Sequence, residues 1–285
     1  MKLKLSIFKS ASENASIYYE KYKKLKEKLD GARKALEKTL KEIEKVEKES
    51  YEEKKIEIKK VVKKEKKWYE KFRWFFISND FLVIGGKDSK QNEILIKRYL
   101  SANDLVFHAD IPGAAFFVLK NPEGKEVPPE IKLEAATLAG VYSKAWKLNL
   151  ASVDVYCVKP EQISKKAPAK TFLAKGAFMI YGKREWFRNI ELKLAIGISL
   201  KDDALEVIAG PISAVSSKTD IFAVIKPGYK KSKELALEIK EFLAKNLSKE
   251  IKEKINALPL EEIQKWIPAG KGTLAKKWHL PLKKK

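Results

Sequence analysis

The sequence predicts an α+β fold, a mixed or antiparallel sheet with packed helices, preceded by a long N-terminal coiled-coil helical arm. Between Ser12 and Trp74 there is no proline, and Gly31 is the only glycine, which favours an uninterrupted helical stretch. Beyond it, short apolar runs come mostly as adjacent pairs around turn residues, which is typical of strand hairpins rather than of strict β-α-β alternation. We therefore divide the chain into an arm, residues 1–70, and one globular domain, residues 71–285, with basic C-terminal helices and a tail.

The arm has a heptad-like apolar seam. Its start is suited to capping by Ser12 or Asn14, because short polar side chains accept bonds from free backbone amides. Lysine and glutamate fill the outer positions, either as a solvated coiled-coil face or as direct phosphate contacts. The seam residues recur at spacings of four and three: Tyr18, Tyr22, Leu25, Leu29, Ala32, Leu36, Leu40 and Ile43. A stripe this narrow must pack on another helix or on a partner.

The seam weakens between Val46 and Ile56, where we expect the turn of a helical hairpin. A second apolar stripe follows at Ile58, Val61, Trp68, Phe72 and Phe75. Because no glycine or proline marks the turn, one continuous helix of roughly 90 Å, at 1.5 Å per residue, is the alternative. Before the arm, Met1–Ser10 alternates lysine with apolar residues, which predicts a short strand.

The domain begins with a predicted strand pair, 72–77 and 81–84, around the turn Ser78-Asn79-Asp80. Asp88 is suited to cap the helix that follows. Further strands are expected at 105–109, 115–119, 152–158, 177–181, 192–200, 204–209 and 221–226. Helices are expected at 130–148, 230–247 and near 259–266, with a basic tail from Lys271. In the first of these helices the residues expected to face inward are Leu133, Ala136, Leu138 and Val141.

Charge and cysteine content narrow the class of protein. The net charge is +22 and the isoelectric point is about 9.7, so polyanions are attracted at long range, and nucleic acid or an anionic membrane surface is the common partner. No run approaches the roughly 18 apolar residues that span a bilayer, so we expect no membrane partner. Cys157 is alone, which excludes an internal disulfide and fits a reduced, cytoplasmic compartment. With two histidines in the chain, we expect neither a metal nor another cofactor.

Three separated motifs go beyond a generic α+β pattern. The first runs from Trp68 to Ser78 (WYEKFRWFFIS) and continues through Ile84–Glu93 (IGGKDSKQNE) to Ile96–Tyr99 (IKRY). The second is Val106–Ala114 (VFHADIPGA). The third joins Gln162–Pro168 (QISKKAP) to Gly176–Lys183 (GAFMIYGK). In this order they resemble the NFACT-R domain, the RNA-binding module of the NFACT family of ribosome quality-control factors, in an archaeal or eukaryotic rather than a bacterial version.

The resemblance extends to the arm, where Asn14-Ala15 and Tyr18-Tyr19 are similar to the coiled coil that precedes NFACT-R. It covers about Lys2 to Gly228 and implies binding to ribosomal RNA, tRNA and the large ribosomal subunit on stalled nascent-chain complexes. Full-length members also carry an NFACT-N domain and a helix-hairpin-helix region, for which we find no counterpart. We therefore expect a fragment, a split-gene product or a stand-alone version, with an NFACT-N polypeptide as a partner in trans. We do not transfer the family's activity, the C-terminal tailing of stalled nascent chains, to this chain.

The candidate RNA contacts in the first two motifs each have a structural alternative. Gly85-Gly86-Lys87 lies at a strand-to-helix junction, where free amides and Lys87 suit a phosphate; a plain glycine turn is the alternative. Gln91 and Asn92 either read base edges or bond the neighbouring loop. His108 is either a buried, hydrogen-bonded histidine or an RNA contact. Lys97 and Arg98, at the end of the first motif, complete this set.

The remaining candidates lie in and beyond the third motif. Lys165-Lys166 and Lys183-Arg184 are basic loop pairs that fit contacts to an RNA backbone, or else ordinary surface residues. We expect the two pairs to line one groove. Trp186 stands among cations, which suits stacking on a single-stranded base; core packing is the alternative.

Two functions from different classes follow from this sequence. The leading one is an RNA-binding module that acts on ribosomes or tRNA without turnover. The second is a coiled-coil interaction scaffold without direct RNA contact, in which the charge serves solubility. An enzyme is third, because no catalytic triad, metal cluster or phosphate loop is recognisable. A single positive face on the domain would favour RNA binding, and an even scatter of charge would favour the scaffold.

Overall fold

The computed structural model describes residues 4–8, 10–53, 67–166, 173, 175–201, 204–245, 247 and 249–275. The chain divides into two compact units, Met1–Glu65 and Lys66–Lys285. Each unit is described by itself. The α+β class predicted from the sequence is confirmed: a long N-terminal helix is followed by antiparallel sheets with helices packed on them.

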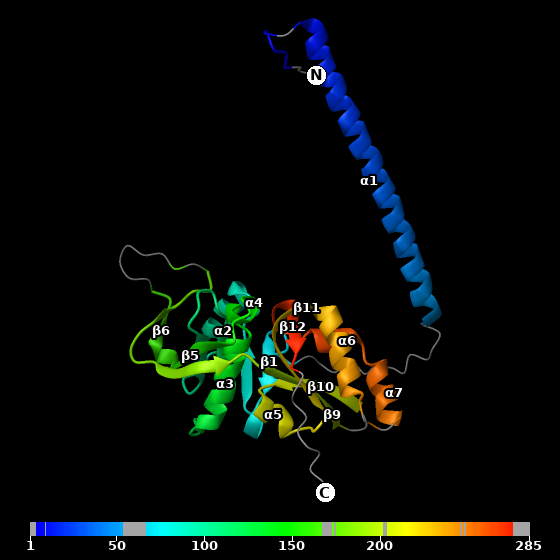
Figure 1. Cartoon of the computed structure of the whole chain (residues 1–285). Coiled ribbons are helices and arrows are strands. Elements are labelled where there is room, and N and C mark those ends of the chain that lie inside the picture. Colours follow the sequence, from blue (N-terminus) through cyan, green and yellow to red (C-terminus); the bar gives the residue numbers. More distant parts are fainter. Residues whose placement is uncertain are drawn as a thin grey trace. The chain divides into compact units, whose positions relative to one another are not determined.

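The first unit is dominated by one helix, α1 (Ala11–Glu53), of 43 residues, drawn as a single rod in Figure 1. The interval in which we expected a turn is helical as far as Glu53, and residues 54–66, with part of the second stripe, lie outside the described residues. Seam residues such as Leu25 are exposed within this unit. The described part of the arm is therefore one straight stretch of about 65 Å at 1.5 Å per residue.

The start of the arm differs from both predictions made for it. Ser10 caps α1, because its Oγ accepts from the Glu13 N–H at 3.3 Å and the Glu13 carboxylate accepts from the Ser10 N–H at 2.7 Å, a reciprocal capping box. Residues 4–8 form no strand. They fold back on α1 instead, where Asn14 Oδ1 accepts from the Ser6 N–H at 2.9 Å and the Tyr18 hydroxyl donates to the Lys4 carbonyl at 2.7 Å. A strand without a neighbour leaves its backbone groups unpaired, and these side chains pair them.

The second unit contains a six-stranded antiparallel sheet in the order β1-β2-β4-β3-β5-β8. Its strands are β1 (Arg73–Phe76), β2 (Leu82–Gly85), β3 (Leu105–Ala109), β4 (Phe116–Leu119), β5 (Ser152–Val158) and β8 (Glu185–Glu191). A 3-10 turn, Ser78–Asp80, joins the first two strands, and Asn79 adopts a positive φ of 55° there, which asparagine tolerates better than most residues. A second 3-10 turn (Pro160–Gln162) leads into a two-stranded sheet of β6 (Ile163–Ser164) and β7 (Met179–Ile180).

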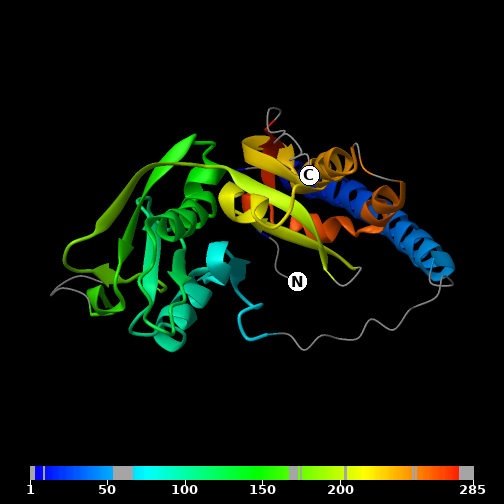
Figure 2. The ribbon, with the colours of Figure 1, turned by 90° about the horizontal axis from the view of Figure 1, so that it is seen from below.

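Helices cover both faces of the large sheet. Successive side chains along a strand point to opposite faces, so neighbouring residues pack against different helices. Phe107 and Phe117 pack toward α3 (Pro129–Val141), and their neighbours Val106 and Val118 pack toward α2 (Ser89–Arg98). The predicted Asp88 cap of α2 is confirmed, with its side chain accepting from the Gln91 N–H. A second sheet, β10-β9-β11-β12, lies beside the first, and Figure 2 shows the two sheets next to each other.

The second sheet comprises β9 (Leu194–Lys201), β10 (Ala204–Gly210), β11 (Phe222–Lys231) and β12 (Lys271–Leu274). It is accompanied by α5 (Ile212–Ser216), α6 (Ser232–Leu243), α7 (Lys249–Ala257), α8 (Leu260–Gln264) and a 3-10 turn (Pro268–Gly270). One apolar core contains residues of both sheets, including Phe117 and Ile196. The buried Glu134 of α3 also ties the two parts together, accepting from Ser78 Oγ at 2.7 Å and Ser213 Oγ at 2.5 Å.

Several predicted elements are corrected. The helix expected at 130–148 is broken, because Ser143 caps a separate α4 (Lys144–Lys147) by accepting from the Ala145 N–H. Leu133 was expected to face inward but is 49% exposed. The helix expected to reach residue 247 ends at Leu243. The sequence patterns missed β8 and α5, and the expected basic tail begins with β12, while residues 276–285 lie outside the described residues.

Candidate functional site

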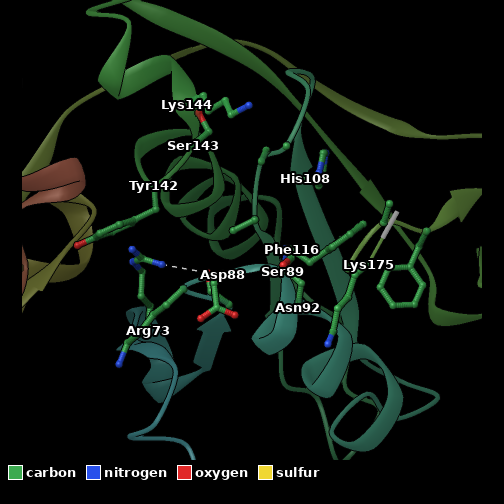
Figure 3. A pocket seen from close by; sticks show the side chains of 18 of the residues that line it. Arg73, Asp88, Ser89, Asn92, His108, Phe116, Tyr142, Ser143, Lys144 and Lys175 are labelled. Carbon is green, nitrogen blue, oxygen red and sulfur yellow. Dashed lines mark hydrogen bonds between the residues drawn. The ribbon is translucent and has the colours of Figure 1, made fainter. Parts of the chain in front are cut away.

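A cavity of about 600 Å³ opens where β2 and β3 end and β4 begins. Its wall combines parts of the chain that are far apart in sequence. Figure 3 shows Arg73 and Tyr142 on one side of this space and His108 and Lys175 on the other, with Ser143 and Lys144 above Asp88, Ser89 and Asn92. We call it the strand-end cavity, defined by its lining residues Arg73, Lys87, Asn92, His108, Phe116 and Lys175.

The start of α2 forms the floor of this cavity through a network of capping bonds. Asp88 Oδ1 accepts from the Gln91 N–H at 2.8 Å, and Gln91 Oε1 accepts from the Lys87 N–H at 3.0 Å. The other end of the Gln91 amide donates to the Lys71 carbonyl at 3.1 Å. Gln91 thus bonds the neighbouring loop with both ends of its side chain, and it holds Lys87 at the cavity.

Asn92 is the buried polar residue of the floor, only 7% exposed. Its Oδ1 is fully buried and has no hydrogen-bond partner among the described residues. A Cβ atom on Gly86 would lie 2.1 Å from this oxygen, so only glycine at position 86 leaves room for it. Buried polar groups are nearly always paired in native proteins, so the unpaired Oδ1 makes Asn92 an exception among the residues that line this cavity.

Arg73 brings a cation into a partly buried position at the cavity wall. Its Nη1 donates to the Gly86 carbonyl at 2.9 Å, and its guanidinium lies 5.3 Å from the centre of the Tyr142 ring. Burial lowers the pKa of Arg73, and burial together with the charge of Arg73 lowers the pKa of Lys87. The described lining includes four lysines besides Arg73 and one carboxylate, that of Asp88. This excess of positive charge attracts an anion.

One face of the large sheet carries a row of rings that ends at the cavity. Strand register places Phe116 opposite His108, His108 opposite Tyr156, and Tyr156 opposite Trp186. The ring centres of these successive pairs are 4.6, 5.6 and 5.4 Å apart. Cations lie over the far end, with Arg184 4.5 Å from the Tyr156 ring and Arg188 4.1 Å from the Trp186 ring. We call these four residues the ring row.

His108 occupies the middle of the ring row. Its Nδ1 lies 3.3 Å from the Tyr156 hydroxyl. Burial is the largest influence on its pKa and lowers it below the ordinary value of 6.5, although backbone hydrogen bonds at Ala114 and Ala109 act in the opposite direction. Since the ordinary pKa already lies below 7, a lowered pKa leaves His108 neutral at neutral pH.

The other residues predicted to contact RNA lie beside the β6–β7 sheet and at the end of α2. Lys165-Lys166 follows β6 and Lys183-Arg184 follows β7, so the antiparallel pairing puts the two pairs at opposite ends of that short sheet. Lys165 lies 3.7 Å from Glu93 and 4.8 Å from the Phe178 ring centre. Lys97, which pairs with Glu93 at 2.8 Å, and Arg98 end α2 and do not line the cavity.

Several cavity residues were not among the sequence candidates. Arg73 and Gly176 lie within the quoted motifs, but no local pattern marked them for this role. Gly176 has a φ of +78°, and a Cβ there would lie 2.4 Å from the Ser89 carbonyl oxygen, so this loop packs directly on the start of α2. Tyr142 follows α3, and Lys144 and Lys147 belong to α4; the predicted continuous helix did not indicate that these residues would meet at a cavity.

Within the described part of the chain, no group of three histidine, cysteine, aspartate or glutamate side chains is arranged to hold a metal ion. None of the helices described combines the length and apolar character needed to cross a membrane.

Comparison with known proteins gives a specific match. Residues 71–182 match the family model described as the NFACT protein RNA binding domain. The chain is 44% identical over 186 residues to the archaeal Rqc2 homolog aRqcH of Methanocaldococcus jannaschii, covering 65% of this chain and 27% of that protein.

Two eukaryotic relatives also match about two thirds of this chain. The chain is 38% identical over 193 residues to the ribosome quality control complex subunit NEMF homolog of Drosophila melanogaster, covering 67% of this chain and 19% of the relative. It is also 38% identical over 195 residues to human ribosome quality control complex subunit NEMF, covering 68% and 18%. The chain thus spans about a quarter or less of the length of these relatives.

Proposed function

Because this chain carries the RNA-binding domain of the NFACT family and is a homologue of Rqc2, NEMF and RqcH proteins, we propose that it binds RNA in ribosome quality control. The observation that carries this proposal is the strand-end cavity, where Arg73 and four lysines face a single carboxylate. A concave, cationic surface in a protein of net charge +22 concentrates polyanions and steers them to one place.

The proposed targets are ribosomal RNA of the large subunit, tRNA, or both, on stalled nascent-chain complexes in the cytoplasm. The chain acts there by binding, without turnover of its own, and an NFACT-N polypeptide is a proposed partner. Contacts of lysine and arginine with phosphates give affinity and register but little sequence selectivity. The ring row, with Arg184 and Arg188 over its rings, provides the stacking surfaces that single-stranded RNA uses.

The test is the salt dependence of binding. The full chain is titrated into labelled tRNA and into a labelled fragment of large-subunit RNA, and fluorescence anisotropy is recorded from low to physiological ionic strength. We expect the logarithm of the affinity to fall by about 0.7–0.9 per log unit of salt for each phosphate contact, because counterions are released. A flat response, or the same response from an unrelated protein of equal charge, would contradict the proposal.

A second candidate function, a coiled-coil interaction scaffold, is favoured by the apolar seam of the arm, where Leu25 is 65% and Leu36 is 62% exposed within the described arm. The two candidates differ in which unit binds RNA. If residues 66–285 alone retain the RNA affinity of the full chain, the domain is the RNA-binding part. If neither the full chain nor residues 66–285 bind RNA while the arm captures a protein partner, the scaffold is correct.

A further inference from the structure

We propose that the strand-end cavity takes one unpaired nucleotide of the bound RNA. Its phosphate lies between Arg73 and the start of α2, and its base lies against the wall formed by His108 and Phe116. This inference rests on the proposed RNA-binding function, and it adds what the cavity recognises: a single extruded or single-stranded nucleotide rather than a stretch of duplex backbone.

The first support is that the cavity has two chemically different walls. One wall carries cations, with Arg73 and Lys87 on the side of β1 and α2 and Lys144 on the side of α4. The opposite wall carries the rings of His108, whose centre is 4.6 Å from that of Phe116, and of Phe178, 5.6 Å from Phe116, with Lys175 on the same side (Figure 3). A ligand that satisfies both walls has an anionic group joined to a flat ring, and a nucleotide has this composition.

The phosphate position is marked by the start of α2. This helix has 10 residues, and its first backbone N–H groups have no acceptor inside the helix. Asp88 satisfies one of them, that of Gln91, so the N–H groups at Ser89 and Lys90 point toward the cavity end of the helix, where the helix dipole also favours an anion. Arg73, which makes no ion pair within the described residues, stands beside them, and its charge interacts at longer range with that of Asp88.

The base position is marked by Asn92. More than nine-tenths of this residue is buried, its Oδ1 has no partner, and the residue lines the cavity. Its Nδ2 likewise makes no hydrogen bond with the described residues, so exchanging the two amide atoms would still leave one unpaired. Asparagine side chains pair with the edges of bases. Because Oδ1 is buried against Gly86, a base lying against His108 and Phe116 meets the Nδ2 end of this amide, which can donate a hydrogen bond to an acceptor on the base edge.

Size and rigidity support the same ligand. The cavity of about 600 Å³ falls within the range of roughly 300–1,000 Å³ that holds small ligands. A base inside a duplex is stacked and paired and cannot enter such a concave site without leaving the stack. The close packing of Gly86 on Asn92 and of Gly176 on Ser89 holds the walls in place before any ligand arrives.

The experiment compares two RNA hairpins of the same sequence, one fully paired and one with a single unpaired adenosine in the stem. Affinity of the full chain for each is measured by anisotropy, and access to the adenine N1 atom is measured by dimethyl sulfate reactivity. We expect the unpaired adenosine to raise affinity about tenfold and to become protected at saturating protein. Equal affinity for the two hairpins, or an adenine that stays reactive, would overturn the inference while leaving RNA binding intact; failure to bind either hairpin would instead contradict the proposed function.

Asn92→Leu separates a recognition role from a structural one. We expect it to abolish the preference for the unpaired adenosine while the affinity for the paired hairpin stays within about twofold. The melting temperature should be unchanged or higher, because the variant removes an unpaired buried polar group. If this variant does not fold, Arg73→Gln provides the second test, with the same expected loss of preference.

Lys125→Gln is the matched control, since it removes one positive charge from an exposed ion pair with Glu123 that lies outside the cavity. It should keep the preference. If Asn92→Leu and Arg73→Gln both retain the preference, the base does not enter this cavity and the inference is wrong. Tight calorimetric binding of adenosine 5′-monophosphate alone, at micromolar concentration, would assign the cavity to a free nucleotide and would also overturn the assignment to RNA.

Discussion

The side chain of Asn92 packs directly on Gly86, so closely that a Cβ atom on residue 86 would lie 2.1 Å from Asn92 Oδ1 and 2.9 Å from the Asn92 backbone nitrogen. The contact joins the end of β2 to the first turn of α2 and sets the position of the one buried amide in the cavity floor. A methyl group at position 86 must therefore displace that amide.

Gly86→Ala is accordingly predicted to cost about 1–3 kcal/mol of stability, the usual range for overpacking, and to weaken binding to RNA that carries an unpaired adenosine. Chemical denaturation and RNA titration of the same preparation measure both effects. Gly31→Ala is the control, because no atom lies within 4 Å of its Cβ position on α1; there alanine should be neutral or stabilise the helix by up to about 1 kcal/mol. Normal binding by a stable Gly86→Ala chain would contradict the role given to Asn92.

Trp186→Ala should reduce both stability and binding to single-stranded RNA. The side chain is half-buried, lies 5.4 Å from the Tyr156 ring centre, and is covered on one side by Arg188 at 4.1 Å. Lost packing is expected to cost about 1–3 kcal/mol of folding stability, and lost stacking about 1–3 kcal/mol of binding to single strands. Melting and binding are measured on one preparation, and an unchanged affinity per folded molecule would assign Trp186 to packing alone.

Charge reversal in the two basic pairs is predicted to have different effects on stability. Lys183→Glu should weaken binding uniformly across RNA sequences with a change of no more than about 0.5 kcal/mol in stability, as for most exposed sites. Lys165→Glu should weaken binding in the same way but also lower the melting temperature. The Lys165 ammonium group lies 3.7 Å from the Glu93 carboxylate, so the substitution replaces an attraction with a repulsion between two carboxylates. Differential scanning fluorimetry and RNA titration test this, with Lys125→Glu as the exposed control. Full affinity in both variants would exclude these pairs from the interface.

Stability should depend on pH through His108. Burial lowers its pKa in the folded chain, so the unfolded chain binds the proton at a higher pH than the folded chain does. As pH falls from about 7.5 to 5.5, through the ordinary histidine pKa of about 6.5, protonation favours the unfolded state and the free energy of unfolding decreases.

The melting temperature of the full chain should therefore fall over this pH range, and His108→Gln should flatten the dependence. Asp110, which raises the His108 pKa, and Arg184, which lowers it, also act on this group. His279→Gln removes the other histidine of the chain, and comparison of the two variants separates the contribution of His108 from that of His279. The same slope in His108→Gln as in the unmodified chain would show that His108 does not titrate in this range.

The domain is predicted to fold without the arm. Residues 66–285 form one compact unit with a core that contains residues of both large sheets. A shortened chain beginning at Lys66 should unfold in one cooperative transition and protect the amides of β3, β4 and β5 in hydrogen exchange. A chain without protected amides would show that the arm is needed for folding.

Much of the local structure was predictable because its signals are local. The bounds expected for β3 and β5 agree with the structure, and Asp88 caps α2 as expected, since alternation of apolar residues and capping chemistry act within a few residues. The apolar pattern alone gave wrong predictions at other positions. Ser143 divides the predicted helix, and Leu133 is exposed although it continues an apolar pattern.

The α+β class, the helical arm, the strongly basic character and the three motifs were predictable from the amino-acid order alone, because composition and short-range spacing express these directly. Which residues meet at the strand-end cavity became visible in the folded chain. Arg73, Asn92, His108 and Lys175 come from separate elements, and strand register alone aligned Phe116 with His108, Tyr156 and Trp186. Register depends on the packing of whole strands against α2 and α3, so residues far apart in the sequence become neighbours only when the complete sheet has formed.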